Sequence, residues 1–132
     1  MASDMSTYFG NKVLRWLTGN TMIAAPASCE VGLFDGDPKG SGTEVTDTIR
    51  TAGRVAITFD AISEGTDNSV QNSADVDFGE AEAQVDFSHV AVFDDADNLL
   101  FAKALAGGPF ADVEAGTPIK FPAGSLVFTL GS

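Results

Sequence analysis

The sequence predicts a mainly β domain, an antiparallel β-sandwich or small barrel of about seven short strands with one N-terminal amphipathic helix. Three observations predict it. Apolar residues recur at helical spacing only near the N-terminus, and beyond residue 27 they alternate with polar ones. Turn-forming residues interrupt this alternation about every ten residues. The length of 132 residues fits a single domain over 1–132.

The first element is expected to be a helix over residues 4–18, with Ser3 or Asp4 capping its start. Its apolar residues form one stripe, made of Met5, Phe9, Val13, Trp16 and Leu17. Lys12 and Arg15 lie toward the C-terminal end, where positive charge suits the helix dipole. The stripe predicts a helix that lies on its own sheet or docks on a neighbouring subunit.

The β region is expected over residues 27–132. Strand patterns are found at 29–34, 55–59, 76–78, 85–93, 99–105, 119–121 and 126–130. Residues 89–93 are nearly all apolar, which predicts a strand covered on both faces. Residues 63–74 are polar and rich in Ser, Asn, Asp and Gly, which predicts an exposed loop.

The charge balance limits the partners. Nineteen acidic residues against seven basic ones give a net charge of -12. Nucleic acids and anionic membrane surfaces are both bound through Lys and Arg, so we expect neither as a partner. Apolar runs fall well short of the roughly 20 residues that cross a bilayer.

Few residues are candidates for chemistry. Cys29 and His89 are single, so a zinc site is not expected. Cys29 lies in an apolar run, which predicts a buried free thiol, and His89 is expected to be a packed or sheet-surface residue. The Asp-rich turns at 35–37 and 94–98 could offer oxygens to calcium, but they lack the spacing of a calcium loop and also suit turns for local reasons. We therefore expect no catalytic residue, no cofactor and no metal site, and we do not expect an enzyme.

Two pairs of acids leave one enzymatic alternative open. Asp75 and Asp77, and Glu80 and Glu82, are each separated by one apolar residue. Glycosidases place two carboxyl groups across a sugar-binding cleft. The alternation of acidic and apolar residues here predicts a solvated strand face instead, so a glycan-directed hydrolase is the least favoured interpretation.

A series of short segments, in fixed order along nearly the whole chain, resembles one known group of proteins. These segments are 8–14 (YFGNKVL), 25–34 (APASCEVGLF), 42–45 (GTEV), 54–59 (RVAITF), 72–78 (NSADVDF), 90–94 (VAVFD) and 119–126 (IKFPAGSL). Together they resemble the small virion proteins of tailed phages that are commonly labelled tail fibre proteins. The resemblance implies a β-rich structural subunit of a phage particle, made in the host cytoplasm.

The size and charge of the chain favour one role over another within that group of proteins. Fibres are long and repetitive, whereas this chain is compact and repeat-free. The leading expectation is a capsid cement or decoration protein on the capsid exterior, a homo-oligomer such as a trimer that binds the major capsid protein. The alternative is a small tail or tail-fibre component that acts in host attachment and contacts tail proteins. The candidate subunit contacts are Phe9, Trp16 and Leu17, because large apolar side chains dominate interface energetics. Otherwise these residues are buried within their own subunit.

Overall fold

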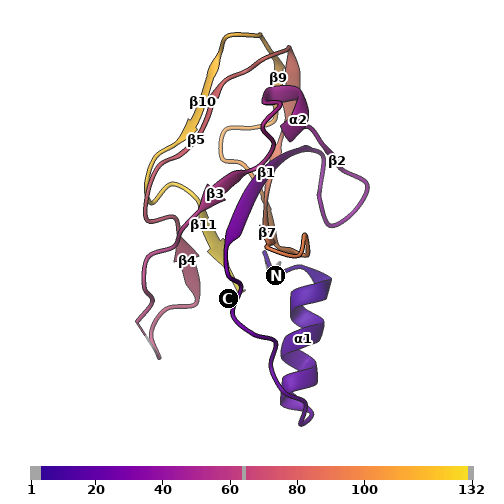
Figure 1. Cartoon of the computed structure of the whole chain (residues 1–132), viewed down its shortest axis with the longest axis vertical. Helices are drawn as coiled ribbons and strands as arrows, with labels where there is room; N and C mark the ends of the chain where they lie inside the picture. The colour runs from indigo at the N-terminus through magenta and orange to yellow at the C-terminus, as the bar shows by residue number, and fades with distance from the viewer. Residues whose placement is uncertain (1–3, 64, 131–132) are drawn as a thin grey trace.

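The computed structural model describes residues 4–63 and 65–130. A body of antiparallel strands fills most of the molecule, and the N-terminal helix projects from one end of its long axis (Figure 1). The elements are α1 (Thr7–Leu17), β1 (Cys29–Asp35), β2 (Thr43–Glu44), α2 (Thr46–Ile49), β3 (Val55–Ile57), β4 (Ser69–Gln71), β5 (Val76–Glu80), β6 (Val85–Phe87), β7 (His89–Asp94), β8 (Leu99–Ala104), β9 (Phe110–Val113), β10 (Pro118–Phe121) and β11 (Val127–Thr129). The predicted mainly β, antiparallel fold with one N-terminal amphipathic helix is confirmed.

The main sheet has the order β2-β1-β7-β8, and β3 pairs with the other end of β1. Its centre is the antiparallel pair of β1 and β7, in which Val31 lies opposite Val92 and Leu33 lies opposite Val90. All four of these side chains are buried. Strand β7 is buried along nearly its whole length. The prediction of a strand covered on both faces is therefore confirmed.

One face of the main sheet carries the hydrophobic core. Three two-stranded pairs, β5 with β10, β4 with β11 and β6 with β9, contribute apolar side chains to the same cluster as β1 and β7. Phe128 is fully buried there. The rings of Phe78 and Phe121 meet edge-on, 6.0 Å apart, across the β5–β10 pair. Burial of this apolar surface is the main driving force for folding.

The opposite face of β7 is covered by a smaller apolar cluster and one cation. Ala91, Phe93 and Ala102 form this cluster. The guanidinium of Arg54 lies 3.5 Å from the centre of the Phe93 ring. Arg54 also donates two hydrogen bonds to Glu44, each 2.9 Å long. The bidentate ion pair therefore lies over this second face of the sheet. The apolar pattern of residues 89–93 predicted that both faces of the strand would be covered.

The expected number of strands was too low. Residues 4–63 and 65–130 contain eleven strands and no closed barrel. The predicted strand over 85–93 divides at Ser88 into β6 and β7, and β2, β4 and β9 have no counterpart in the prediction. The added strands have two to four residues each, and strands that short carry almost no periodicity.

The segment 63–74 was predicted to be an exposed loop, but part of it forms a strand and part of it is buried. Strand β4 within it pairs with β11, and Asn72 is completely buried. The Asn72 amide nitrogen donates to the carbonyls of Ala74 and Pro122, at 2.9 and 3.0 Å. Its side-chain oxygen accepts from the amide of Leu126 at 2.9 Å. A buried Asn is tolerated because its polar atoms are all used in this way.

The helix begins later than predicted. The hydroxyl of Ser6 accepts a hydrogen bond from the amide of Phe9, so Ser6 is the N-cap. Ser3, one of the two predicted caps, lies outside the described residues. Asp4, the other, pairs with β11 instead: its amide donates to the carbonyl of Thr129, and its carboxylate accepts from the Thr129 amide. Residues 4–6 therefore extend the sheet and fix the base of α1.

Candidate functional site

The first half of α1 packs against its own β-body. The Phe9 ring meets that of Phe101 edge-on, with centroids 5.5 Å apart. Phe101 in turn lies 5.8 Å from Phe128 in the core. The Ser6 amide donates to the carbonyl of Leu100 at 2.8 Å, beside this aromatic contact. Of the three candidate subunit contacts, Phe9 is therefore half-buried within its own subunit.

The second half of α1 extends beyond the sheet (Figure 1). Trp16 is 57% exposed and Leu17 is 71% exposed, although both belong to the predicted apolar stripe. Leu14, which lies beside the stripe, is 60% exposed. The apolar stripe included Trp16 and Leu17 as candidate contacts. It did not include Leu14, because Leu14 lies on a different face of the helix. We call Leu14, Trp16 and Leu17 the helix tip.

An apolar groove lies where α1 meets the β-body. Its volume is about 540 Å³, and its walls are the start of α1, the linker that follows the helix, and the turn between β7 and β8. The lining residues include Tyr8, Met22, Pro26, Cys29, Asp95 and Phe101. The volume falls in the range of pockets that bind small molecules or protein side chains. Periodicity offered no signal for this groove, because its walls come from segments distant in the sequence.

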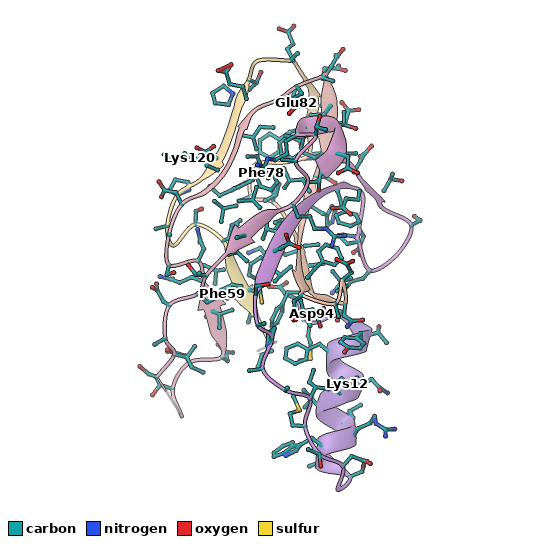
Figure 2. The ribbon with its side chains drawn as sticks, viewed as in Figure 1. Lys12, Phe59, Phe78, Glu82, Asp94 and Lys120 are labelled. Carbon is teal, nitrogen blue, oxygen red and sulfur yellow. The ribbon has the colours of Figure 1, made fainter. Side chains whose placement is uncertain are left out.

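Charge divides the chain into two parts. Residues 5–29, which form the helix and its linker, contain Lys12 and Arg15 and no acidic residue. Residues 30–132 contain 18 of the 19 acidic residues and five of the seven basic ones. Lys12 lies on the projecting helix, and Asp94 lies where the helix meets the body (Figure 2). A basic arm with apolar side chains is therefore attached to a strongly acidic body.

The turn between β7 and β8 places carboxylates at the edge of the groove. Asp94 accepts hydrogen bonds from the amides of Ala96 and Asn98, at 2.9 and 2.8 Å, and from the Asn98 side chain at 3.1 Å. Burial raises the pKa of Asp94, but these hydrogen bonds outweigh it and hold the pKa below its usual value. The Asp94 carboxylate therefore stabilises the turn, whereas the neighbouring Asp95 is exposed to solvent.

The thiol of Cys29 opens on the same groove. Cys29 is a free cysteine and is half-buried, rather than buried as predicted. Burial raises its pKa, and the negative charges of Asp94 and Asp95 raise it further. The thiol therefore stays protonated at neutral pH, which makes it a weak nucleophile.

The side chains of Ser88 and His89, which are adjacent in the sequence, contact each other at the start of β7. The Ser88 hydroxyl lies 2.7 Å from Nδ1 of His89. The same hydroxyl accepts a hydrogen bond from the amide of Gly36 at 3.0 Å, and the Ser88 amide donates to the carbonyl of Phe34. Ser88 therefore joins the end of β1 to β7 at the point where the chain passes from β6 to β7.

The paired acids lie at exposed positions within β5 or just beyond its ends. Asp77, Glu80 and Glu82 are exposed, whereas Val76 and Ala81 between them are buried. This is the alternation that the sequence predicted for a solvated face. Asp75 forms an ion pair with Lys120 at 3.2 Å, and Glu82 accepts hydrogen bonds from Thr51.

Residues 4–63 and 65–130 contain neither a metal-ligating cluster nor a membrane-spanning helix. No three His, Cys, Asp or Glu side chains gather there as a metal site requires. No helix in these ranges has the length and hydropathy to cross a membrane.

The chain matches a known protein family over nearly its whole length. Residues 4–129 match the family model described as Gp80, podophage GP4 fiber I protein gp80. The matched range includes α1, the linker and every strand of the described chain. No curated protein matches the sequence.

Proposed function

This chain belongs to the family of the podophage GP4 fiber I protein gp80 and is a phage structural protein, and we propose that it is a component of the fibre apparatus outside the particle. The match over residues 4–129 carries the proposal, because the family is named for a fibre protein. In this role the chain acts by binding other proteins of the virion and catalyses no reaction.

The geometry supports a role in assembly. Monomeric soluble proteins rarely leave large apolar side chains grouped on a projecting element. Trp16 and Leu17 are grouped in this way, on a helix whose base is fixed to β8 and β11. A rigid element that presents apolar side chains is a suitable contact for another subunit of the particle.

A capsid decoration protein is the second candidate. Its support is the compact body, which lacks the long repeats of a fibre shaft, and the acidity of that body. An acidic surface suits a position outside the shell, away from packaged DNA. In this role the partner is the outer surface of the major capsid protein.

The number of copies per particle separates the two candidates. We propose mass spectrometry of purified particles with labelled standard peptides for this chain and for the major capsid protein. A fibre component is expected in a small multiple of the tail symmetry, whereas a decoration protein is expected in numbers comparable to the major capsid protein. Labelling of intact particles with an antibody to the exposed loop at 36–42 then gives the position. Absence of the chain from purified particles would overturn both candidates.

A further inference from the structure

The helix tip needs a partner whose chemistry matches its own. Leu14, Trp16 and Leu17 offer an apolar surface. Arg15 lies among them in the sequence, and Lys12 lies two residues before Leu14. Buried apolar contact with charged residues at the rim is the usual composition of a protein interface. The partner surface should therefore be an apolar groove with carboxylates at its edge.

The chain itself carries such a surface. The groove of about 540 Å³ is lined mainly by apolar residues, and the acidic turn that contains Asp95 lies at its edge. Residues 30–132 have a strongly negative balance, whereas residues 5–29 are purely basic in their charged side chains. Opposite charge on two parts of one chain favours contact between two copies, and it also steers their encounter.

The tip of a helix cannot reach the groove of its own subunit. Leu17 lies eight residues after Phe9, a distance of about 12 Å along the helix axis at 1.5 Å per residue. Phe9 itself lines the groove and is held against Phe101. Leu14, Trp16 and Leu17 do not line the groove at the base of their own helix, so the tip would meet a groove of this kind on another copy.

We propose that the helix tip of one copy docks into the groove of a second copy, with Lys12 and Arg15 facing the acidic turn that contains Asp95. The inference rests on the proposed function and deepens it by naming the first partner of the helix tip. Because tip and groove are different surfaces, the contact is head-to-tail, and contacts of this type close into rings when the rotation permits. A ring closed by three copies would be the trimer that the analogy with capsid decoration proteins implies.

The mass of the purified full-length chain in solution is the first test. Light scattering after size exclusion should give a multiple of the 13.7 kDa chain, and the mass should fall as salt rises because the contact includes opposite charges. Leu17→Asp, and Lys12→Glu combined with Arg15→Glu, should each reduce the mass to that of one chain. Ile62→Asp and Lys39→Glu are the matched controls, since both residues are exposed and lie outside the groove, and they should leave the mass unchanged.

A charge exchange guards against variants that simply misfold. Asp95→Lys added to the Lys12→Glu, Arg15→Glu variant should restore the oligomer, because the charges on both sides of the contact are then reversed together. Asp95 has an exposed side chain, so this change leaves the core intact. Thermal unfolding of each variant shows whether the fold is retained.

Chemical cross-linking then tests which surfaces meet. Cys29 is the sole cysteine of the sequence and lines the groove. In the Leu17→Cys variant, a short bismaleimide added at mildly alkaline pH should join the two positions between chains and double the mass on a denaturing gel. The same reagent should give no doubled mass with Ile62→Cys, or with Leu17→Cys combined with Cys29→Ala.

Failure of this inference is distinguishable from failure of the proposed function. A chain that is monomeric in solution at all concentrations, or an oligomer that Leu17→Asp and the charge reversal leave intact, overturns the docking of tip into groove. The chain would remain a virion protein if it is found in purified particles. An oligomer that behaves as expected, together with absence from particles, would overturn the proposed function alone.

Discussion

The edge of the Phe9 ring meets Phe101 at an interplanar angle of 86°, and this contact divides the apolar stripe of α1 into two parts. Before it, Asp4 and Ser6 hydrogen-bond to the edge of the β-body. After it, Trp16 and Leu17 are exposed. One stripe therefore serves two purposes: its first half fixes the helix, and its second half is available to a partner.

Phe9→Ala should loosen the helix, whereas Trp16→Ala should not affect the stability of the single chain. Loss of a fully buried Phe side chain costs about 3–5 kcal/mol, and about half of that is expected for the half-buried Phe9. Trp16 is 57% exposed, so its removal should change the free energy of unfolding by less than about 0.5 kcal/mol. Each substitution is combined with Leu17→Asp, which keeps the protein monomeric, and urea unfolding then gives the free energy of unfolding of each variant. Equal losses for the two variants would contradict the division of the stripe.

The sequence predicted the helix and its stripe, but not where the stripe ceases to be covered. Spacing of 3.6 residues places Phe9 and Trp16 on the same face. Whether that face meets a sheet depends on where β8 ends, which is a contact distant in sequence. The start of the helix was misplaced for a similar reason, because the hydrogen bonds of Asp4 with Thr129 keep residues 4–6 extended.

Asn72→Ala should destabilise the fold strongly although Asn72 makes no contact with the helix tip. The substitution leaves the buried Leu126 amide without its acceptor, and it removes a donor from the carbonyls of the exposed residues Ala74 and Pro122. An unsatisfied buried group costs about 1–3 kcal/mol, and a loss in that range is expected. Gln71→Ala, at the exposed neighbouring position, is the control and should cost little. Chemical unfolding curves of both variants give the comparison, and a small loss for Asn72→Ala would contradict the hydrogen bonding described.

The polar segment 63–74 shows why composition misled at this point. Residues such as Asn and Ser favour loops because their side chains compete for backbone hydrogen bonds. Asn72 does bind backbone groups, but those of Leu126 and Pro122, about fifty residues away. A buried polar residue that links distant segments has the same local composition as a loop, so the sequence could not distinguish the two.

The free energy of unfolding should fall at acid pH, partly because Glu44 becomes protonated. Burial raises the pKa of Glu44, but the hydrogen bonds from Arg54 and Thr46 and the charge of Arg54 outweigh it and hold the pKa below its ordinary value of 4.5. The ion pair therefore stabilises the fold fully above about pH 4.5, and this stabilisation is lost as the pH falls through the lower pKa of the folded state. Thermal unfolding should show Glu44→Gln less stable than the native chain at pH 7, with the difference narrowing toward acid. A difference that stays constant with pH would contradict this assignment.

Gly42→Ala should disturb the loop between β1 and β2. A β-carbon at Gly42 would lie 2.5 Å from the carbonyl oxygen of Gly36, and Gly36 has a φ of +94° that other residues rarely adopt. Because the obstacle is backbone, the loop must move, at a cost of about 1–3 kcal/mol. Gly40→Ala is the control, since its β-carbon would meet its nearest atom at an ordinary 3.8 Å. Differential scanning calorimetry of the two variants should show a lower Tm for Gly42→Ala alone, and equal Tm values would contradict this packing.

The central claim is that a structural protein of a phage particle uses the end of its N-terminal helix as a contact surface. A density map of the intact particle, at a resolution that shows side chains, tests this most directly. We expect the chain on the outside of the particle, with Trp16 and Leu17 buried against another protein chain, which we propose to be a second copy. A map in which this chain is present with both side chains facing solvent, or from which the chain is missing altogether, would contradict it.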